Sequence, residues 1–261
     1  MRFLILSFAI LIFWSCLSST KVNNHNWKQL FNGRDLDGWV VKINGHETGE
    51  NFGNTFRVKD KIISVRYDQY DTFNDRFGHL YYKTPFSYYH LVIEYRFVGE
   101  FFKSAPEYAR LNSGVMFHSQ DPATMLKDQN WPISVEMQFL GGLGDGKERT
   151  TGNMCSPGTN VVINGKLDTR HCINSTSRTY EGEQWVRAEL MVWGDSLVKH
   201  IINGDTVLQY SKPQIGGNVV AGYRPEMKKD GMLLKEGLIA LQSEGQPIDF
   251  RKLEIRELRR P

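Results

Sequence analysis

The 261-residue sequence lacks a dominant charge, a long hydrophobic run and the signature motifs of several enzyme classes. Its 32 basic and 29 acidic residues leave a net charge of +3, which is too even for a protein that follows a phosphate backbone, so we expect no nucleic-acid partner. The longest apolar run, residues 3–14, is shorter than the about 20 residues of a membrane-spanning helix. A phosphate-binding glycine loop, a G-x-S-x-G nucleophile elbow and an H-E-x-x-H zinc motif are also missing.

The short apolar run is typical of a secretion signal. It follows Arg2 and ends at Ser15 and Cys16, the arrangement of a signal peptide. The sequence Phe13-Trp14-Ser15-Cys16 resembles a relaxed, Bacteroidetes-type lipobox, in which the cysteine is acylated and becomes the mature N-terminus. An ordinary signal peptide with an incidental cysteine is the alternative. We therefore predict a signal peptide over residues 1–15, a short tether over 16–26, one domain over 27–261, and a lipid-anchored protein in the periplasm or at the outer-membrane surface of a Gram-negative bacterium.

Cysteine is scarce, with three residues in the chain. If Cys16 carries the anchor, Cys155 and Cys172 remain as an even pair in an oxidising compartment, which predicts a disulfide. Such a bond stabilises a chain by about 3 kcal/mol in the chain-entropy model. A metal site formed by Cys155, His171 and Cys172 is the alternative, although no fourth ligand stands at a standard spacing.

Aromatic residues are abundant, at 12% of the chain, and occur with 24 glycines, a composition typical of strands joined by turns. Apolar residues alternate every two positions in the segments 91–97, 133–139, 185–193, 197–202 and 206–210. Between the last two, Asn203-Gly204 predicts a two-residue hairpin turn. The best helix candidate is one short turn over 121–127, with Asp121 as its N-cap and Pro122 at its first position. We therefore predict a single all-β sandwich.

Polar residues gather on a few of these strands. In 133–139, Glu136 and Gln138 share one face with Ser134. If the strand that contains His118 is a neighbour, its imidazole and the Glu136 carboxylate point to the same open face. Glu244, with Gln242 on the same face of segment 237–245, forms a carboxylate pair with Glu136 in this interpretation. The alternative is a merely solvated outer face.

Four short motifs resemble one protein family in its own order. They are Phe31–Trp39, similar to its opening "LFNGKDLSGW"; Asn112–Val115, similar to its "NSG" strand; Glu136–Leu140, similar to its "E-x-Q" strand; and Ala240–Gly245 with Ile248–Arg251, similar to its closing segment. The family is the 3-keto-disaccharide hydrolases, long catalogued as a domain of unknown function. The resemblance extends over about residues 27 to 258.

The resemblance implies a concanavalin A-like jelly-roll sandwich of two antiparallel sheets, secreted or lipid-anchored, that acts on carbohydrate as a glycoside hydrolase or lyase. A ketone at C3 of the sugar acidifies the C2 proton, so a base removes it, the glycosidic oxygen leaves and water adds to the enone. In this scheme His118 is the base, Glu136 orients it or serves as the acid, and Arg110 stabilises the oxyanion. Asn112, Gln138, Gln242 and Glu244 hold sugar hydroxyls, and Trp131 stacks on the ring.

Two points are left open by the resemblance. A divalent cation held by His118, Glu136 and Glu244 is an alternative to Arg110 as the electrophile. Many members of the family carry His where this chain has Glu244 and Arg where it has His118, so the catalytic assignment does not transfer directly. The alternative functions are a non-catalytic, lectin-like carbohydrate-binding lipoprotein and a structural subunit with a large exposed apolar patch.

Overall fold

The computed structural model describes residues 27–260. The predicted signal peptide, the lipid-attachment residue Cys16 and the tether over 16–26 lie outside the described residues. Within 27–260, no helix has the length and apolar character needed to cross a membrane. The helical segments of this range are four 3-10 turns, η1 (Phe52–Asn54), η2 (Glu107–Ala109), η3 (Pro122–Thr124) and η4 (Pro225–Met227).

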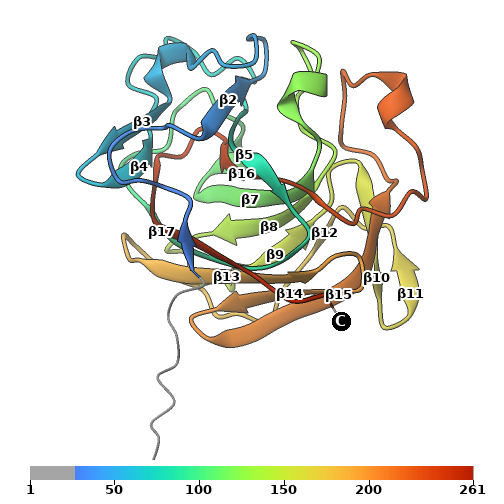
Figure 1. Cartoon of the computed structure of the whole chain (residues 1–261). Helices are drawn as coiled ribbons and strands as arrows, with labels where there is room; N and C mark the ends of the chain where they lie inside the picture. The colour runs from blue at the N-terminus through green and yellow to red at the C-terminus, as the bar shows by residue number, and fades with distance from the viewer. Residues whose placement is uncertain (1–26, 261) are drawn as a thin grey trace, which may run out of the picture.

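Two antiparallel sheets face each other (Figure 1). The ten-stranded sheet has the order β11-β10-β15-β14-β13-β6-β17-β4-β3, with β1 beside β17. Its strands are β1 (Lys28–Gln29), β3 (Phe56–Lys59), β4 (Ile62–Val65), β6 (Tyr88–Phe97), β10 (Thr159–Ile163), β11 (Lys166–Asp168), β13 (Val186–Trp193), β14 (Leu197–Ile202), β15 (Asp205–Ile215) and β17 (Ile248–Glu257). The seven-stranded sheet has the order β12-β9-β8-β7-β16-β5-β2. Its strands are β2 (Trp39–Ile43), β5 (Gly78–Phe86), β7 (Asn112–Ser119), β8 (Val135–Leu140), β9 (Asn153–Cys155), β12 (Cys172–Ile173) and β16 (Gly237–Ser243).

The all-β sandwich predicted from the sequence is confirmed, and so are the predicted hairpin turn and the predicted short helical turn. The hairpin between β14 and β15 turns at Asn203 and Gly204, whose φ angles of 49° and 96° are those a primed turn requires. The predicted short helix is the single turn η3, and the Asp121 carboxylate accepts a hydrogen bond from the Ala123 N–H as its N-cap.

The core lies between the sheets and decides which side chains face outward. Tyr95 of β6 stacks on Phe139 of β8, with ring centroids 4.1 Å apart, so aromatic packing joins the two sheets. Val135, Met137 and Phe139 are fully buried in this core. Because side chains alternate along a strand, Glu136 and Gln138 point to the opposite face of the seven-stranded sheet.

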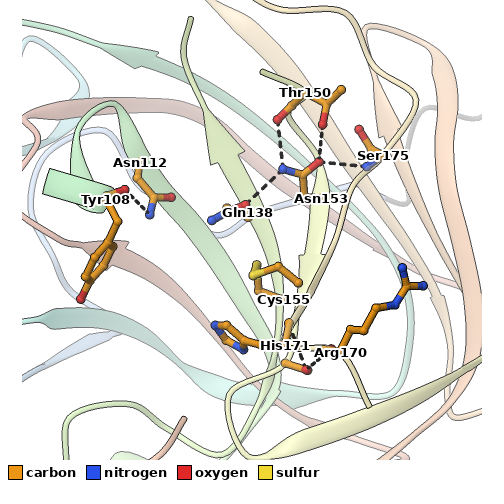
Figure 2. The surroundings of a disulfide bond; sticks show 11 residues. Tyr108, Asn112, Gln138, Thr150, Asn153, Cys155, Arg170, His171 and Ser175 are labelled. Atoms are coloured by element: carbon orange, nitrogen blue, oxygen red, sulfur yellow. Dashed lines mark hydrogen bonds between the residues drawn. A yellow bond between two sulfur atoms is a disulfide. The ribbon is translucent and has the colours of Figure 1, made fainter. Parts of the chain in front are cut away.

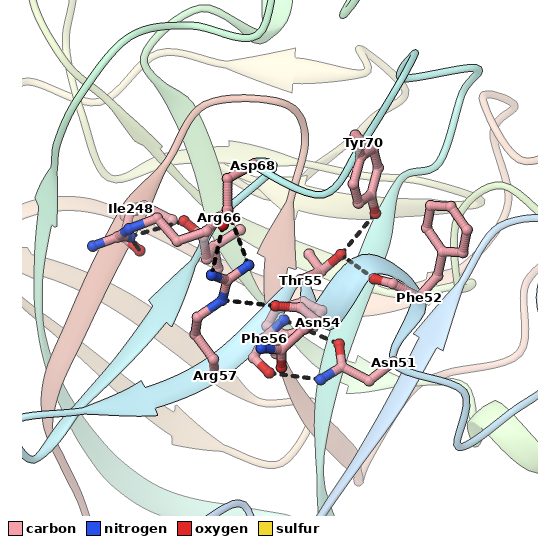
Figure 3. Close-up of polar contacts among 11 residues, drawn as sticks. Asn51, Phe52, Asn54, Thr55, Phe56, Arg57, Arg66, Asp68, Tyr70 and Ile248 are labelled. Atoms are coloured by element: carbon pink, nitrogen blue, oxygen red, sulfur yellow. Dashed lines mark hydrogen bonds and ion pairs between the residues drawn. The ribbon is translucent and has the colours of Figure 1, made fainter.

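Loops surround that opposite face, and the three that carry η1, η3 and η4 rise together at the top of Figure 1. The Lys42 ammonium joins two of them by donating to the carbonyl oxygens of His46 at 3.0 Å and Lys127 at 2.8 Å. Figure 3 shows how the first loop is fixed: Arg57 pairs with Asp68 at 2.7 Å, and the Thr55 and Tyr70 hydroxyls share a hydrogen bond. The walls above the sheet are therefore tied to one another and to the sandwich.

Candidate functional site

A cavity of about 590 Å³ opens on the face of the seven-stranded sheet that points away from the core. This volume lies in the usual range for small-molecule sites. Strands β7, β8, β9, β12 and β16 supply its floor, and loops supply its walls. It is lined by Tyr108, Asn112, Trp131, Glu136, Gln138, Leu140, Arg149, Cys155, Pro157, His171, Cys172, Val219, Gln242 and Glu244.

Two buried carboxylates lie in the floor of this cavity. Glu136 projects from β8, and Glu244 directly follows β16; their residues are 6% and 3% exposed. Gly114 of β7 provides the space for the first carboxylate, because an added Cβ there would collide with it. Within residues 27–260 neither glutamate forms a salt bridge, and Oε2 of Glu244 has no hydrogen-bond partner.

The two glutamates resist ionisation together. Burial, followed by the negative charge of Glu244, raises the pKa of Glu136 well above its ordinary value. Burial also raises the pKa of Glu244, to about 8. Two neighbouring carboxyl groups in a site of low polarity cannot easily both ionise, so the pair holds at least one proton near neutral pH. Such a pair combines a proton donor and a proton acceptor.

Amide groups complete the floor. The buried oxygens Oδ1 of Asn112 and Oε1 of Gln242 accept no hydrogen bond from residues 27–260. Oε1 of Gln138 accepts a hydrogen bond from the Asn153 amide at 3.1 Å, which leaves its Nε2 free to donate (Figure 2). Buried polar groups without partners are costly in a folded chain. The floor therefore offers unpaired acceptors and one oriented donor, a combination that suits a ligand rich in hydroxyl groups.

The structure corrects the expected position of His118. This residue has a positive φ of 46°, and the pairing of β7 with β16 is irregular beside it, so the strict alternation of β7 ends there. Its Nε2 lies 3.1 Å from the carbonyl oxygen of Gly194, and burial lowers its pKa to about 4. His118 lines a separate, smaller cavity. The expectation that it shares an open face with Glu136 is wrong.

Arg110 and Trp131 also differ from the expectation. Arg110 lies outside the cavity, pairs with Glu107 at 2.6 Å and stacks over the Phe101 ring. Trp131 lines the cavity but is 9% exposed and packs against Phe77 and His79. Little of its surface is therefore open to a sugar. Asn112, Glu136, Gln138, Gln242 and Glu244 line the same cavity. The strand pattern predicted this for the two glutamates and the two glutamines, and the family resemblance for Asn112.

Three polar residues of the lining were not predicted as site residues of this cavity from the sequence. Tyr108 is 60% exposed at the rim, and burial with the nearby Glu244 charge raises its pKa to about 12. Arg149 donates to the carbonyl oxygens of Gly141 and Leu111. His171, which the sequence suggested only as a metal ligand, lines the cavity beside Cys155 and Cys172. All three stand in loops or irregular segments, where strand periodicity gives no signal.

The predicted disulfide between Cys155 and Cys172 is present (Figure 2) and lies at the edge of the cavity floor. It joins β9 to β12 at directly paired positions, and Cys155 is in turn paired with Glu136 of β8. The bond therefore fixes the edge of the sheet next to one of the two carboxylates. The sulfur atoms and a ring nitrogen of His171 lie within 4.8 Å of one another, but both sulfurs are used in the disulfide.

The family model of the 3-keto-alpha-glucoside-1,2-lyase-like domain matches residues 26–256. The chain belongs to this family. Within the lyase-like domain, the two glutamates and the amides of the floor all fall inside the matched range. A search of curated proteins found no match.

Solved structures share the fold of this lyase-like domain. Two crystal structures of putative glycosyl hydrolases from Parabacteroides distasonis are similar to it. The first has 18% sequence identity and a TM-score of 0.52, and the alignment covers 89% of this chain and 99% of the other chain. The second has 17% identity and a TM-score of 0.51, and the alignment covers 90% of this chain and 94% of the other chain. A Bacillus subtilis protein of unknown function with a galectin-like fold aligns with a TM-score of 0.51 at 9% identity and covers 90% and 96%. The lyase-like domain is thus a lectin-type sandwich, as predicted.

Proposed function

We propose that the protein cleaves glycosides whose sugar carries a ketone at C3, by proton abstraction at C2, elimination and hydration. The observation that carries the proposal is the pair Glu136 and Glu244, two carboxyl groups buried in the cavity floor with raised pKa values and no cationic partner among residues 27–260. Burial of this kind is costly to the fold and is typical of acid–base sites. Membership in the lyase-like family supports the same chemistry.

The two carboxyl groups take different roles. We assign Glu244 as the group that ionises, because its buried Oε2 has no hydrogen-bond partner within residues 27–260 and can accept a proton, and Glu136 as the group that stays protonated. Ionised Glu244 takes the C2 proton of the sugar. The electrons of the C2–H bond first move onto the C3 carbonyl as an enolate. The enolate then collapses to form the C1–C2 double bond and breaks the bond from C1 to the aglycone oxygen, which takes its proton from Glu136. Glu136 then takes a proton from water, whose hydroxyl adds to C1, while Glu244 returns its proton to C2, so that the net reaction is hydrolysis and both groups regain their starting protonation.

The negative charge that develops on the C3 oxygen needs a donor. Arg110, the group expected from the resemblance, lies outside the cavity. We assign this role to Nε2 of Gln138, because Asn153 holds the amide with its nitrogen free. Asn112 and Gln242 supply the acceptors for sugar hydroxyls, and the exposed Tyr108 ring at the rim replaces Trp131 as the stacking surface.

A divalent cation also fits this floor, but not with the ligands first expected. Carboxylate and amide oxygens of Glu136, Glu244, Asn112 and Gln242 are the hard donors that such ions prefer, and several of these oxygens have no partner within 27–260. His118 does not fit, because it lines a different cavity. When bound, a cation would polarise the C3 carbonyl as a Lewis acid.

Single substitutions test the two roles. Glu244→Gln is expected to lower turnover of any 3-keto-glucoside by about 10²–10⁴-fold, since the base is lost. Glu136→Gln is expected to lower turnover of methyl 3-keto-glucosides by a similar factor. Turnover of nitrophenyl 3-keto-glucosides is expected to fall far less, because nitrophenolate leaves without a proton. The matched control is Glu148→Gln, at an exposed glutamate outside the cavity. Full turnover by Glu244→Gln would overturn the assignment.

A non-catalytic, lectin-like role is the second candidate, and the unpaired amide oxygens of the floor favour it as much as they favour an enzyme. The two functions differ in what the glutamates do. A lectin would bind 3-keto-glucosides and glucosides without releasing the aglycone, with and without chelator. Measured release above the rate of the Glu244→Gln variant excludes it.

The membrane anchor is a separate proposal. Attachment through Cys16 would place the domain in the periplasm or at the outer-membrane surface. Metabolic labelling with a fatty acid tests this, with Cys16→Ser as the control; labelling of the variant would refute it.

A further inference from the structure

The cavity has two chemically different sides. The side formed by β7, β8 and β16 carries the carboxyl and amide groups. The side beyond β9 carries the disulfide, Pro157, Val219 and His171. In that second group, the only hydrogen-bonding side-chain atoms are the ring nitrogens of His171, and burial lowers the pKa of this imidazole, which favours its neutral form.

Val219 is held in place at a conformational cost. Its φ is 72°, a left-handed value that a β-branched residue rarely adopts. The side chain is 45% exposed, so core packing does not explain the position. The neighbouring carbonyl of Asn218 accepts a hydrogen bond from the Gly158 N–H at 2.9 Å, which fixes the loop against the residue that follows Pro157. An exposed apolar side chain in a costly backbone conformation at a cavity mouth indicates a contact with a ligand.

The flat and polarisable groups of this side point to one kind of ligand. The proline ring and the imidazole present flat faces, and sulfur makes favourable contacts with aromatic rings. A second sugar would leave several hydroxyl groups without partners here, which costs binding energy. Cys155 is paired with Glu136, the acid assigned to the aglycone oxygen, so this side begins where the leaving group must lie.

The geometry points to an aglycone subsite that accepts an aromatic ring, formed by the Cys155–Cys172 disulfide, Pro157, His171 and Val219. The substrates are then aryl glycosides and not oligosaccharides. This inference rests on the proposed function for the position of the leaving group. The binding surface itself exists whether or not the reaction does.

Calorimetry with uncleavable 1-thioglucosides tests the subsite. Burying a phenyl ring is expected to make phenyl 1-thioglucoside bind about tenfold more tightly than methyl 1-thioglucoside. Val219→Asn introduces a polar residue that tolerates a positive φ. It is expected to reduce this ratio to about threefold and to leave binding of the methyl compound unchanged. Leu167→Asn, at an exposed leucine outside the cavity, is the control and is expected to leave the ratio unchanged.

Two results would overturn the subsite: a phenyl-to-methyl ratio near one, or a thio-linked disaccharide that binds more tightly than the phenyl compound. Failure of the proposed function is distinguishable. A preserved phenyl preference without turnover of any 3-keto-glucoside contradicts the reaction and supports the subsite. Turnover with a ratio near one contradicts the subsite alone.

Discussion

Replacing Glu244 by Gln is expected to stabilise the protein at neutral pH while it lowers turnover by about 10²–10⁴-fold. The pKa of Glu244 is raised from 4.5 to about 8 in the folded chain. Between these values the folded state binds more protons than the unfolded state, so its stability falls as the pH rises through this window. At pH 7 the penalty is about 3 kcal/mol, at 1.36 kcal/mol for each pH unit above 4.5.

The glutamine variant escapes this penalty because it does not ionise. An amide with incomplete hydrogen bonds costs about 1 kcal/mol, so we expect a net gain of about 2 kcal/mol at pH 7 and a small loss at pH 4, where both states of the wild type are mostly protonated. Urea unfolding at the two pH values measures the difference, with Glu148→Gln as the control. A change in relative stability of less than about 1 kcal/mol between pH 4 and pH 7 would refute the reasoning.

Three further outcomes follow from the same residues. The pH profile of kcat/KM is expected to be bell-shaped, with an acid limb near the Glu244 pKa of about 8 and a limb at higher pH where Glu136 loses its proton; a profile flat from pH 6 to 10 would contradict this. Gly114→Ala displaces the Glu136 carboxylate and is expected to lower kcat more than tenfold while the unfolding midpoint changes little; unchanged kcat would contradict the packing argument. The double variant Cys155→Ser and Cys172→Ser is expected to lose about 3 kcal/mol of stability, and dithiothreitol should bring the wild type to the same value; a wild type that resists the reductant, or a variant that responds to it, would show that the bond does not act in this way.

The strand pattern was sufficient to predict the fold and half of the site. Period-two alternation places Glu136 and Gln138 on the face of the sheet opposite to that of the buried Val135 and Met137. This prediction needs only the sequence of the one strand. The same alternation failed at His118, because one residue with a positive φ turns its side chain away from the cavity face. A local change of register leaves no trace in the composition of a strand.

Groups that reach the cavity from loops could not be predicted in the same way. Tyr108, Arg149 and His171 lie in segments without periodicity, and only the folded chain brings them to the wall. Arg110 and Tyr108 are two positions apart, yet one pairs with Glu107 outside and the other stands at the rim. In such segments the conformation of the loop decides which of two nearby residues reaches the cavity.

The buried ammonium of Lys42 affects how experiments with chelators are interpreted. Its Nζ donates to three carbonyl oxygens, those of Ile43, His46 and Lys127, an arrangement of oxygens around a positive charge like that of a small metal site. Here the charge is covalently part of the chain, so it cannot be extracted. Removal of divalent ions should leave these loops in position, and any chelator effect on turnover would then report on the cavity floor and not on its walls.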